Sequence, residues 1–193
     1  MTTLQPNTAL PARQRILVTA HELFYRDGIR ATGIDRVIAE SGVTKVTFYR
    51  HFPSKNDLVL AYLEHRHRLW MDWLSEALDR HALPSGSTLT SRLIGAFKEW
   101  FESESYRGCA FINAVVELEA SVPEVARIAI RHKNELIELI AGQLPPTPER
   151  HERALAIAVA LDGAIVRAQM EQTPASALLA LNILLPTILQ EAV

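Results

Sequence analysis

The sequence predicts an all-α protein of about nine helices, with an N-terminal three-helix helix-turn-helix domain and a C-terminal helical domain. Apolar residues recur at three- and four-residue spacing along the chain, and no segment has the alternating pattern of a half-buried strand. Two short helical patterns in residues 28–58 are separated by Gly42 and followed by a longer one. We expect residues 1–11 to form a disordered arm, 12–53 the helix-turn-helix domain and 54–193 the larger helical domain.

The first two helices are predicted from their end signals. A helix with apolar residues at helical spacing runs between Pro11, a plausible first-turn residue, and Gly28, a plausible stop. Thr32 and Asp35 have capping-box spacing, so the Thr hydroxyl and the Asp carboxylate are expected to satisfy free amides where the second helix starts. That helix should end near Gly42, which supplies the tight turn to the third.

The next two helices are also predicted from their caps. Thr44 can cap a short third helix from Lys45 to about His51, in which Phe48 joins a small core. The sequence of residues 54–57, Ser-Lys-Asn-Asp, is a second capping-box pattern. It opens a long fourth helix that should reach the Arg80 region.

Five further helices complete the prediction, each placed by its apolar spacing and by flanking Ser, Thr, Pro or Gly residues. They are expected at about 89–102, 108–120, 123–144, 148–172 and from 174 towards the C-terminus.

Composition narrows the class of protein. The 193 residues are 48% hydrophobic and 22% charged, which is typical of a globular protein. The single cysteine, Cys109, excludes an internal disulfide framework, and the sequence predicts no metal or cofactor. The apolar stretches after Leu155 and Leu178 are interrupted by polar residues and Pro186, so we expect a soluble protein in a reducing cytoplasm.

Charge is unevenly distributed although the net charge is only −2. Residues 1–68 hold ten Lys or Arg and six Asp or Glu, whereas residues 69–193 hold ten and sixteen. The N-terminal part is therefore basic and the rest of the chain acidic, which suggests that the N-terminal part binds the phosphate groups of a nucleic acid.

Four motifs in residues 28–58 carry a resemblance to a known family. They are Thr32, Ile38-Ala39-Glu40-Ser41-Gly42-Val43, Tyr49-Arg50-His51-Phe52 and Ser54-Lys55-Asn56-Asp57-Leu58. In this order and spacing they resemble the signature of TetR-type transcriptional regulators. The resemblance implies that the helix-turn-helix binds DNA and that residues 54–193 bind a ligand and form a dimer.

The resemblance also implies roles for single residues. The third helix is short enough to lie in a major groove and to present Thr44, Lys45, Val46 and Thr47 to base edges. The expected phosphate contacts are made by Thr32, Tyr49, His51 and Lys55, and they would fix the register on the duplex. Val46 stands where the family often has a small residue, and it could contact a thymine methyl group.

A dimer is expected because one reading domain makes few phosphate contacts. The last two predicted helices are apolar on nearly every side, so they need cover from the chain itself or from a partner. The residues predicted at the dimer interface are Leu155, Val159, Gly163, Val166, Leu178, Leu181, Leu185 and Ile188. Burial within one chain is the alternative.

A pocket for an unknown small-molecule effector is expected among the middle helices, as in the family. The candidate lining residues combine aromatic surface with a polar stripe on the helix near residue 113. They are Trp70, Trp73, Phe97, Trp100, Phe101, Cys109, Phe111, Asn113 and Glu117. Each of them can instead be an ordinary core or surface residue.

These patterns and the resemblance together imply a cytoplasmic, nucleoid-associated repressor that binds a pseudo-palindromic operator as a dimer and is released by a small molecule. A transcriptional activator of the same fold and a helical protein-interaction module are the alternatives. An enzyme with Cys109 as nucleophile and His132 as base is disfavoured, because Cys109 lies in no recognised nucleophile motif. Double-stranded DNA is the expected partner, and no membrane or enzymatic role is expected.

Overall fold

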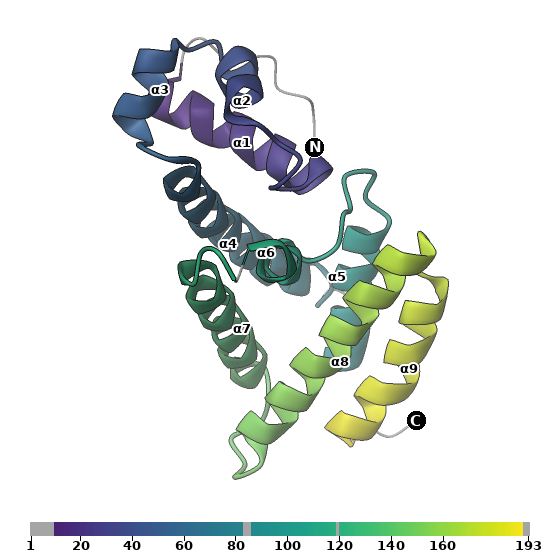
Figure 1. Cartoon of the computed structure of the whole chain (residues 1–193). Coiled ribbons are helices and arrows are strands. Elements are labelled where there is room, and N and C mark those ends of the chain that lie inside the picture. The colour runs from purple at the N-terminus through teal and green to yellow at the C-terminus, as the bar shows by residue number, and fades with distance from the viewer. Residues whose placement is uncertain (1–9, 83–85, 119, 191–193) are drawn as a thin grey trace. The chain divides into compact units, whose positions relative to one another are not determined.

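A computed structural model describes residues 10–82, 86–118 and 120–190, so the expected N-terminal arm lies almost entirely outside the described residues. Within these ranges the chain forms nine helices and no strand, which confirms the all-α prediction (Figure 1). The helices are α1 Ala12–Asp27, α2 Ile34–Ser41, α3 Lys45–His51, α4 Lys55–Arg80, α5 Leu89–Phe101, α6 Ala110–Leu118, α7 Glu124–Gly142, α8 Arg150–Glu171 and α9 Ala175–Leu189.

The chain divides into two compact units. The first consists of Met1–Arg68 with Ala110–Ala129, and the second consists of Leu69–Cys109 with Ile130–Val193. The three N-terminal helices therefore share a unit with the beginning of α4, with α6 and with the start of α7. A domain boundary at residue 53 remains a prediction.

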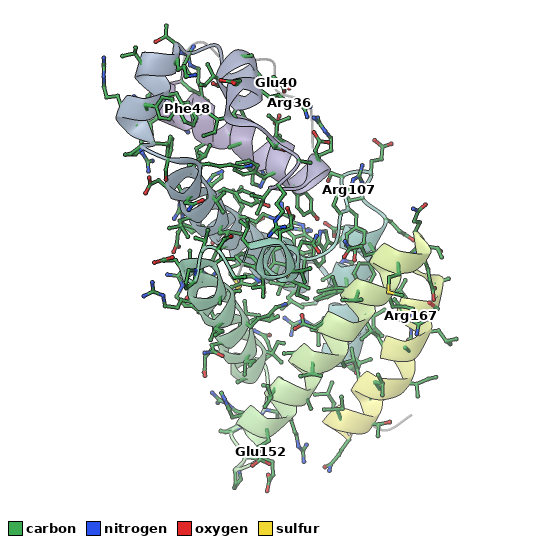
Figure 2. All side chains as sticks on the ribbon, in the orientation of Figure 1. Arg36, Glu40, Phe48, Arg107, Glu152 and Arg167 are labelled. Atoms are coloured by element: carbon green, nitrogen blue, oxygen red, sulfur yellow. The ribbon has the colours of Figure 1, made fainter. Side chains whose placement is uncertain are left out.

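In the first unit, helices α1, α2 and α3 pack around a small apolar core (Figure 1). Ile16, Ala20, Val37 and Phe48 are all completely buried, and Figure 2 shows Phe48 turned from α3 towards the other two helices. Removal of a large apolar side chain from water contributes about 1.5–3 kcal/mol. This core makes α2 and α3 a fixed pair.

In the first unit, the predicted turn at Gly42 and two of the three predicted side-chain caps are confirmed. Gly42 adopts a left-handed conformation with φ +63°, and its N–H bonds back to Ala39 at the end of α2. Thr44 accepts a hydrogen bond from the N–H of Thr47, at 3.2 Å. Ser54 accepts one from the N–H of Asp57, at 3.1 Å, so both predicted caps are confirmed.

The predicted capping box at the start of α2 is wrong. The N-cap residue is Gly33, and no side chain caps the helix there. The Thr32 hydroxyl lies inside the unit and donates to the carbonyl oxygen of Gly28, at 2.8 Å. Thr32 thus stabilises the turn before α2 instead of capping the helix.

In the second unit, α8 and α9 lie side by side, and α5 packs against α9 (Figure 1). The core between these helices includes Leu161, Ile165 and Leu181, each at most 1% exposed. The Tyr106 hydroxyl donates to the carbonyl oxygen of Ile165 at 2.7 Å, which fixes the segment after α5 on α8. An ion pair between Lys133 and Asp162 joins α7 to α8.

Candidate nucleic-acid interface

Helix α3 presents an outward face because its inward face is held by Phe48. The Phe48 ring is completely buried and contacts the rings of Tyr49 and Phe52. With 3.6 residues per turn, burial of Phe48 leaves its neighbours on the opposite side exposed. Val46 is 71% exposed, Tyr49 is 41% exposed and Lys45 is exposed as well. Seven residues span only about 10 Å, which a major groove admits.

Two threonines are oriented by each other at the start of α3. The hydroxyl groups of Thr44 and Thr47 are hydrogen-bonded at 2.9 Å, in addition to the Thr44 cap. Thr44 is exposed and Thr47 is half-buried. Whichever hydroxyl donates in that bond, the Thr47 oxygen keeps a lone pair that can accept from a base or a bridging water.

The expected phosphate contacts differ in accessibility. Tyr49 is exposed and braced edge-on by Phe48, whereas His51 and Lys55 are half-buried. Burial lowers the pKa of Lys55, and the nearby Glu117 carboxylate opposes that effect. The Lys55 ammonium at the start of α4 therefore already lies near a negative charge.

The predicted phosphate contact of Thr32 is wrong. Its side chain is completely buried and its hydroxyl donates to Gly28, so it does not face a phosphate. The wrong prediction arose because a threonine three residues before an acid has the same sequence spacing in a cap and in this turn. The role of Thr32 is to hold the turn that precedes α2.

Arg13 is a cation that sequence patterns did not single out. Its guanidinium lies over the ring of Phe52, with 5.1 Å between the guanidinium carbon and the ring centroid. This contact places a positive charge of α1 beside the end of α3. No sequence signal pairs these two residues, because only the packing of α1 against α3 brings them together.

Several salt bridges connect exposed and half-buried side chains of α1, α2 and α3. Asp27 pairs with Arg26 and Arg36, and Arg36 also reaches Glu40 of α2, which Figure 2 labels beside it. Hydrogen bonding by Arg26, with a further contribution from Arg36, lowers the pKa of Asp27 to about 2. The Lys45 ammonium is 3.8 Å from Asp35, and both side chains are well exposed. Such an exposed pair is weak, so Lys45 can exchange Asp35 for a phosphate or base.

The predicted pocket residues fall in both compact units. Trp70, Phe97, Trp100 and Phe101 form a buried cluster of aromatic rings in the second unit, which Trp73 also contacts. Cys109 is buried in the same unit. In the first unit, Phe111 is buried and contacts His67, and Asn113 is half-buried.

Glu117 makes contacts that the sequence did not predict. Its carboxylate accepts hydrogen bonds from the backbone N–H groups of Ile29 and Arg30 in the first unit, at 3.4 and 2.7 Å. Those bonds use both oxygen atoms. The sequence could not indicate this contact because it joins residues 87 and 88 positions apart.

The predicted interface residues are divided between surface and core. Leu155, Val159, Gly163 and Val166 form an exposed stripe on α8, and Leu178 and Ile188 of α9 are half-buried. Leu181 and Leu185 are completely buried within their own unit, which corrects their assignment to an interface. The exposed apolar residues of α9 are instead Leu179, Ile183 and Leu184. Because α9 is apolar on nearly every side, its sequence does not indicate which side faces the core of its own unit.

A search of the described helices finds none with enough length and apolar character to cross a membrane.

Comparison with known proteins agrees with this geometry. Residues 16–62, which include α2, α3 and the start of α4, match the model of bacterial regulatory proteins of the tetR family. An uncharacterised HTH-type transcriptional regulator of Lactococcus lactis is 28% identical over 109 residues, which cover 56% of this chain and 55% of that protein. The transcriptional activator FasR of Mycolicibacterium smegmatis is 35% identical over 100 residues, which cover 49% and 43%. The chain thus spans about half the length of these curated relatives.

A solved structure extends the likeness over the whole fold. The TetR-family regulator SCO4454 of Streptomyces coelicolor superposes with a TM-score of 0.73 at 28% identity, covering 92% of this chain and 95% of that one. The matched region contains the buried Phe48, the Gly42 turn and the exposed face of α3. Residues 16–62 thus match the tetR family of bacterial regulatory proteins, and the fold of the chain resembles that of a TetR-family transcriptional regulator.

Proposed function

We propose that the protein is a homodimeric transcriptional regulator that binds a pseudo-palindromic operator through α3. The observation that supports this most is the exposed face of α3, where Val46 and Tyr49 stand out from a helix fixed by the buried Phe48. Thr44, Lys45, Val46 and Thr47 are proposed to read bases. Tyr49, His51 and Lys55 are proposed to contact phosphates.

The dimer is proposed on the exposed apolar surface of the second unit. Val159 of α8 and Leu179 and Ile183 of α9 are each more than 60% exposed. Leu179 and Ile183 are four residues apart and so lie side by side on α9, and monomeric proteins rarely leave contiguous apolar surface in water. A second copy of the chain would cover them through the same surface, as a two-fold interface requires. Two reading helices on one duplex would then raise the affinity.

An effector site is proposed at the aromatic cluster of the second unit. Trp70 is only 6% exposed, and its indole N–H has no acceptor among the described residues. A buried donor without an acceptor costs free energy, which a ligand oxygen or nitrogen could recover. The rings of Trp100 and His132 lie 5.6 and 5.1 Å from the ring of Trp70. We therefore propose an aromatic effector with a hydrogen-bond acceptor.

The effector proposal is tested by thermal denaturation with a panel of aromatic ketones and phenols. A ligand of this site should raise the melting temperature of the wild type and raise that of Trp70→Phe less, because phenylalanine lacks the N–H. Stabilisation by no member of the panel, or equal stabilisation of both proteins, would contradict the proposed site.

The direction of regulation depends on where the operator lies. We propose repression, in which the dimer blocks a promoter and effector binding releases it. For release, the effector must prefer the conformation that binds DNA poorly, and DNA must weaken effector binding by the same factor. Activation is a second candidate, because FasR is a transcriptional activator. Promoter-reporter assays with and without the gene distinguish the two. The proposed place of action is the bacterial nucleoid in the cytoplasm.

The DNA-binding proposal is tested by the salt dependence of affinity for a generic 30-base-pair duplex. Phosphate contacts release counterions, so log K should fall linearly with log salt, by about 0.9 per contact. Lys45→Ala should make the slope shallower by up to about one, because an ammonium group in the groove also neutralises phosphate charge and releases counterions. A protein that serves only as an interaction module would show no such binding.

Lys98→Ala is the matched control for that measurement. Lys98 is also an exposed lysine near an acid, Glu102, but it lies on α5 in the second unit. Its removal should leave the slope unchanged. An equal effect of the Lys45 and Lys98 substitutions would mean that α3 is not the contact surface.

A further inference from the structure

The last turn of α6 holds the turn between α1 and α2 through one carboxylate. Glu117 Oε2 accepts from the N–H of Arg30 at 2.7 Å, and Oε1 accepts from the N–H of Ile29 at 3.4 Å. All three residues belong to the first compact unit. Hydrogen bonds to an ionised acceptor are about twice as strong as those between neutral groups. The contact is therefore a directed attachment of α6 to this turn.

The turn that Glu117 holds has a conformation needing outside support. Gly28 ends α1 with φ +90° and ψ 153°, a region that is essentially restricted to glycine. Ile29 is buried, and Thr32 donates to the carbonyl oxygen of Gly28 from the other side of the turn. Thr32 and Glu117 thus fix the carbonyl and the N–H groups of the same short segment.

This segment determines where α2 begins. Only Gly33 separates Thr32 from α2, and α2 packs against both α1 and α3. Glu117 also lies near Lys55, the first residue of α4, whose ammonium it favours electrostatically. One carboxylate of α6 therefore acts on the segment that precedes α2 and on the first residue of α4. The side chains proposed to read bases lie between these two points, on α3 and at its N-cap.

We propose that Glu117 is a positioning residue for DNA binding, which sets the placement of α2 and α3 by holding the backbone of Ile29 and Arg30. Glu117 touches no DNA in this proposal. The DNA part of this proposal rests on the proposed function, whereas the contact itself can be tested without DNA.

The first test is amide hydrogen exchange in the free full-length protein, resolved by residue. In Glu117→Ala, the amides of Ile29 and Arg30 should exchange about tenfold faster or more, because they lose their acceptor. Glu117→Gln keeps one acceptor oxygen without the charge, so its exchange rates should lie between those of the alanine variant and the wild type. It also gives a second reading if the alanine variant does not fold.

Glu124→Ala is the matched control for exchange. Glu124 belongs to the same unit, and its carboxylate pairs with Arg127 on its own helix. Its removal should leave the Ile29 and Arg30 amides unchanged. Wild-type exchange rates at these two amides in both Glu117 variants, or an equal acceleration in Glu124→Ala, would overturn the proposal.

The second test is affinity for a duplex selected by the wild type from a random pool. Glu117→Ala should bind it about tenfold more weakly without a shallower salt slope, because no phosphate contact is lost. Glu117→Gln should recover part of the affinity. Unchanged affinity, or a slope reduced by about one, would contradict a positioning role. If the wild type selects no duplex, the proposed function fails, while the exchange result still decides whether Glu117 holds the turn.

Discussion

The buried hydroxyl of Thr32 donates to the carbonyl oxygen of Gly28 across the turn that joins α1 to α2. At 3.5 Å the same hydroxyl also reaches the carbonyl oxygen of Leu23 in the last turns of α1. The end of one helix is thereby fixed to the start of the next. Thr32 has the sequence position of a helix cap, but its hydroxyl instead joins the end of α1 to the segment before α2.

Thr32→Val should lower the free energy of unfolding by about 1–3 kcal/mol. Valine has nearly the same shape but cannot donate, so the buried carbonyl of Gly28 loses its partner. Urea denaturation followed by circular dichroism measures the change. Thr147→Val, at an exposed position in the segment before α8, should change the stability little. Equal losses in the two variants would contradict the role of Thr32.

Gly28→Ala should destabilise the protein by about 1–3 kcal/mol, because alanine is strained at the backbone angles of Gly28. Gly33 is the matched control in the same turn. It has φ −77° and ψ 151°, and a Cβ added there would meet no atom within 4 Å. Gly33→Ala should therefore cost less, at most about 1 kcal/mol, because only the N-cap preference for glycine over alanine is lost. If thermal denaturation gave the two variants the same midpoint, the backbone conformation at position 28 would not explain why a glycine stands there.

Acid should destabilise the protein through His21. Burial, with contributions from the Arg66 guanidinium and His65, lowers the pKa of His21 from 6.5 to about 3. Between these values the unfolded chain binds a proton that the folded chain does not, so stability falls as the pH drops from about 6.5 towards 3. One such proton contributes a slope of up to about 1.4 kcal/mol per pH unit.

His21→Gln removes that titrating group while keeping an acceptor for Arg66, whose Nη1 is 3.5 Å from His21 Nε2. The pH dependence of the unfolding free energy should be shallower in this variant. His151→Gln, which changes an exposed histidine, should retain the wild-type slope. A His21→Gln curve parallel to that of the wild type would show that His21 does not titrate on unfolding in this range.

Leu179→Asp should convert the proposed dimer to a monomer. The substitution places a charge in the exposed apolar face of α9, where burial by a partner would desolvate it. Light scattering after size exclusion measures the mass. Ile130→Asp is the control, because Ile130 is as exposed as Leu179 but lies on α7. A wild-type protein that is already monomeric at micromolar concentration would contradict the dimer itself.

Sequence patterns predicted the elements that local interactions determine. The starts of α3 and α4 follow from Thr44 and Ser54, whose hydroxyl groups bond within the next three residues. The exposure of Val46 and the burial of Phe48 likewise follow from helical spacing on a short helix.

The predictions that failed concern side chains whose contacts lie outside their own helix. Thr32 is turned inward by the end of α1, and Glu117 is directed at Ile29 and Arg30. Leu181 is covered by its own unit, although its apolar neighbours on α9 remain exposed. A single sequence gives the period of an apolar helix but not the side that faces its own core.

The central claim, that α3 reads DNA in a dimer, is tested most directly by selecting duplexes from a random pool with the wild type and with Tyr49→Ala. The wild type should enrich a palindromic motif with two half-sites, as expected of two-fold symmetry. Tyr49→Ala should enrich it weakly or not at all, because the substitution removes an exposed contact. The ring contact with Phe48 is lost as well, so circular dichroism should show that the variant is folded. Enrichment of no motif by the wild type at low salt, or of the same motif equally by both proteins, would contradict the claim.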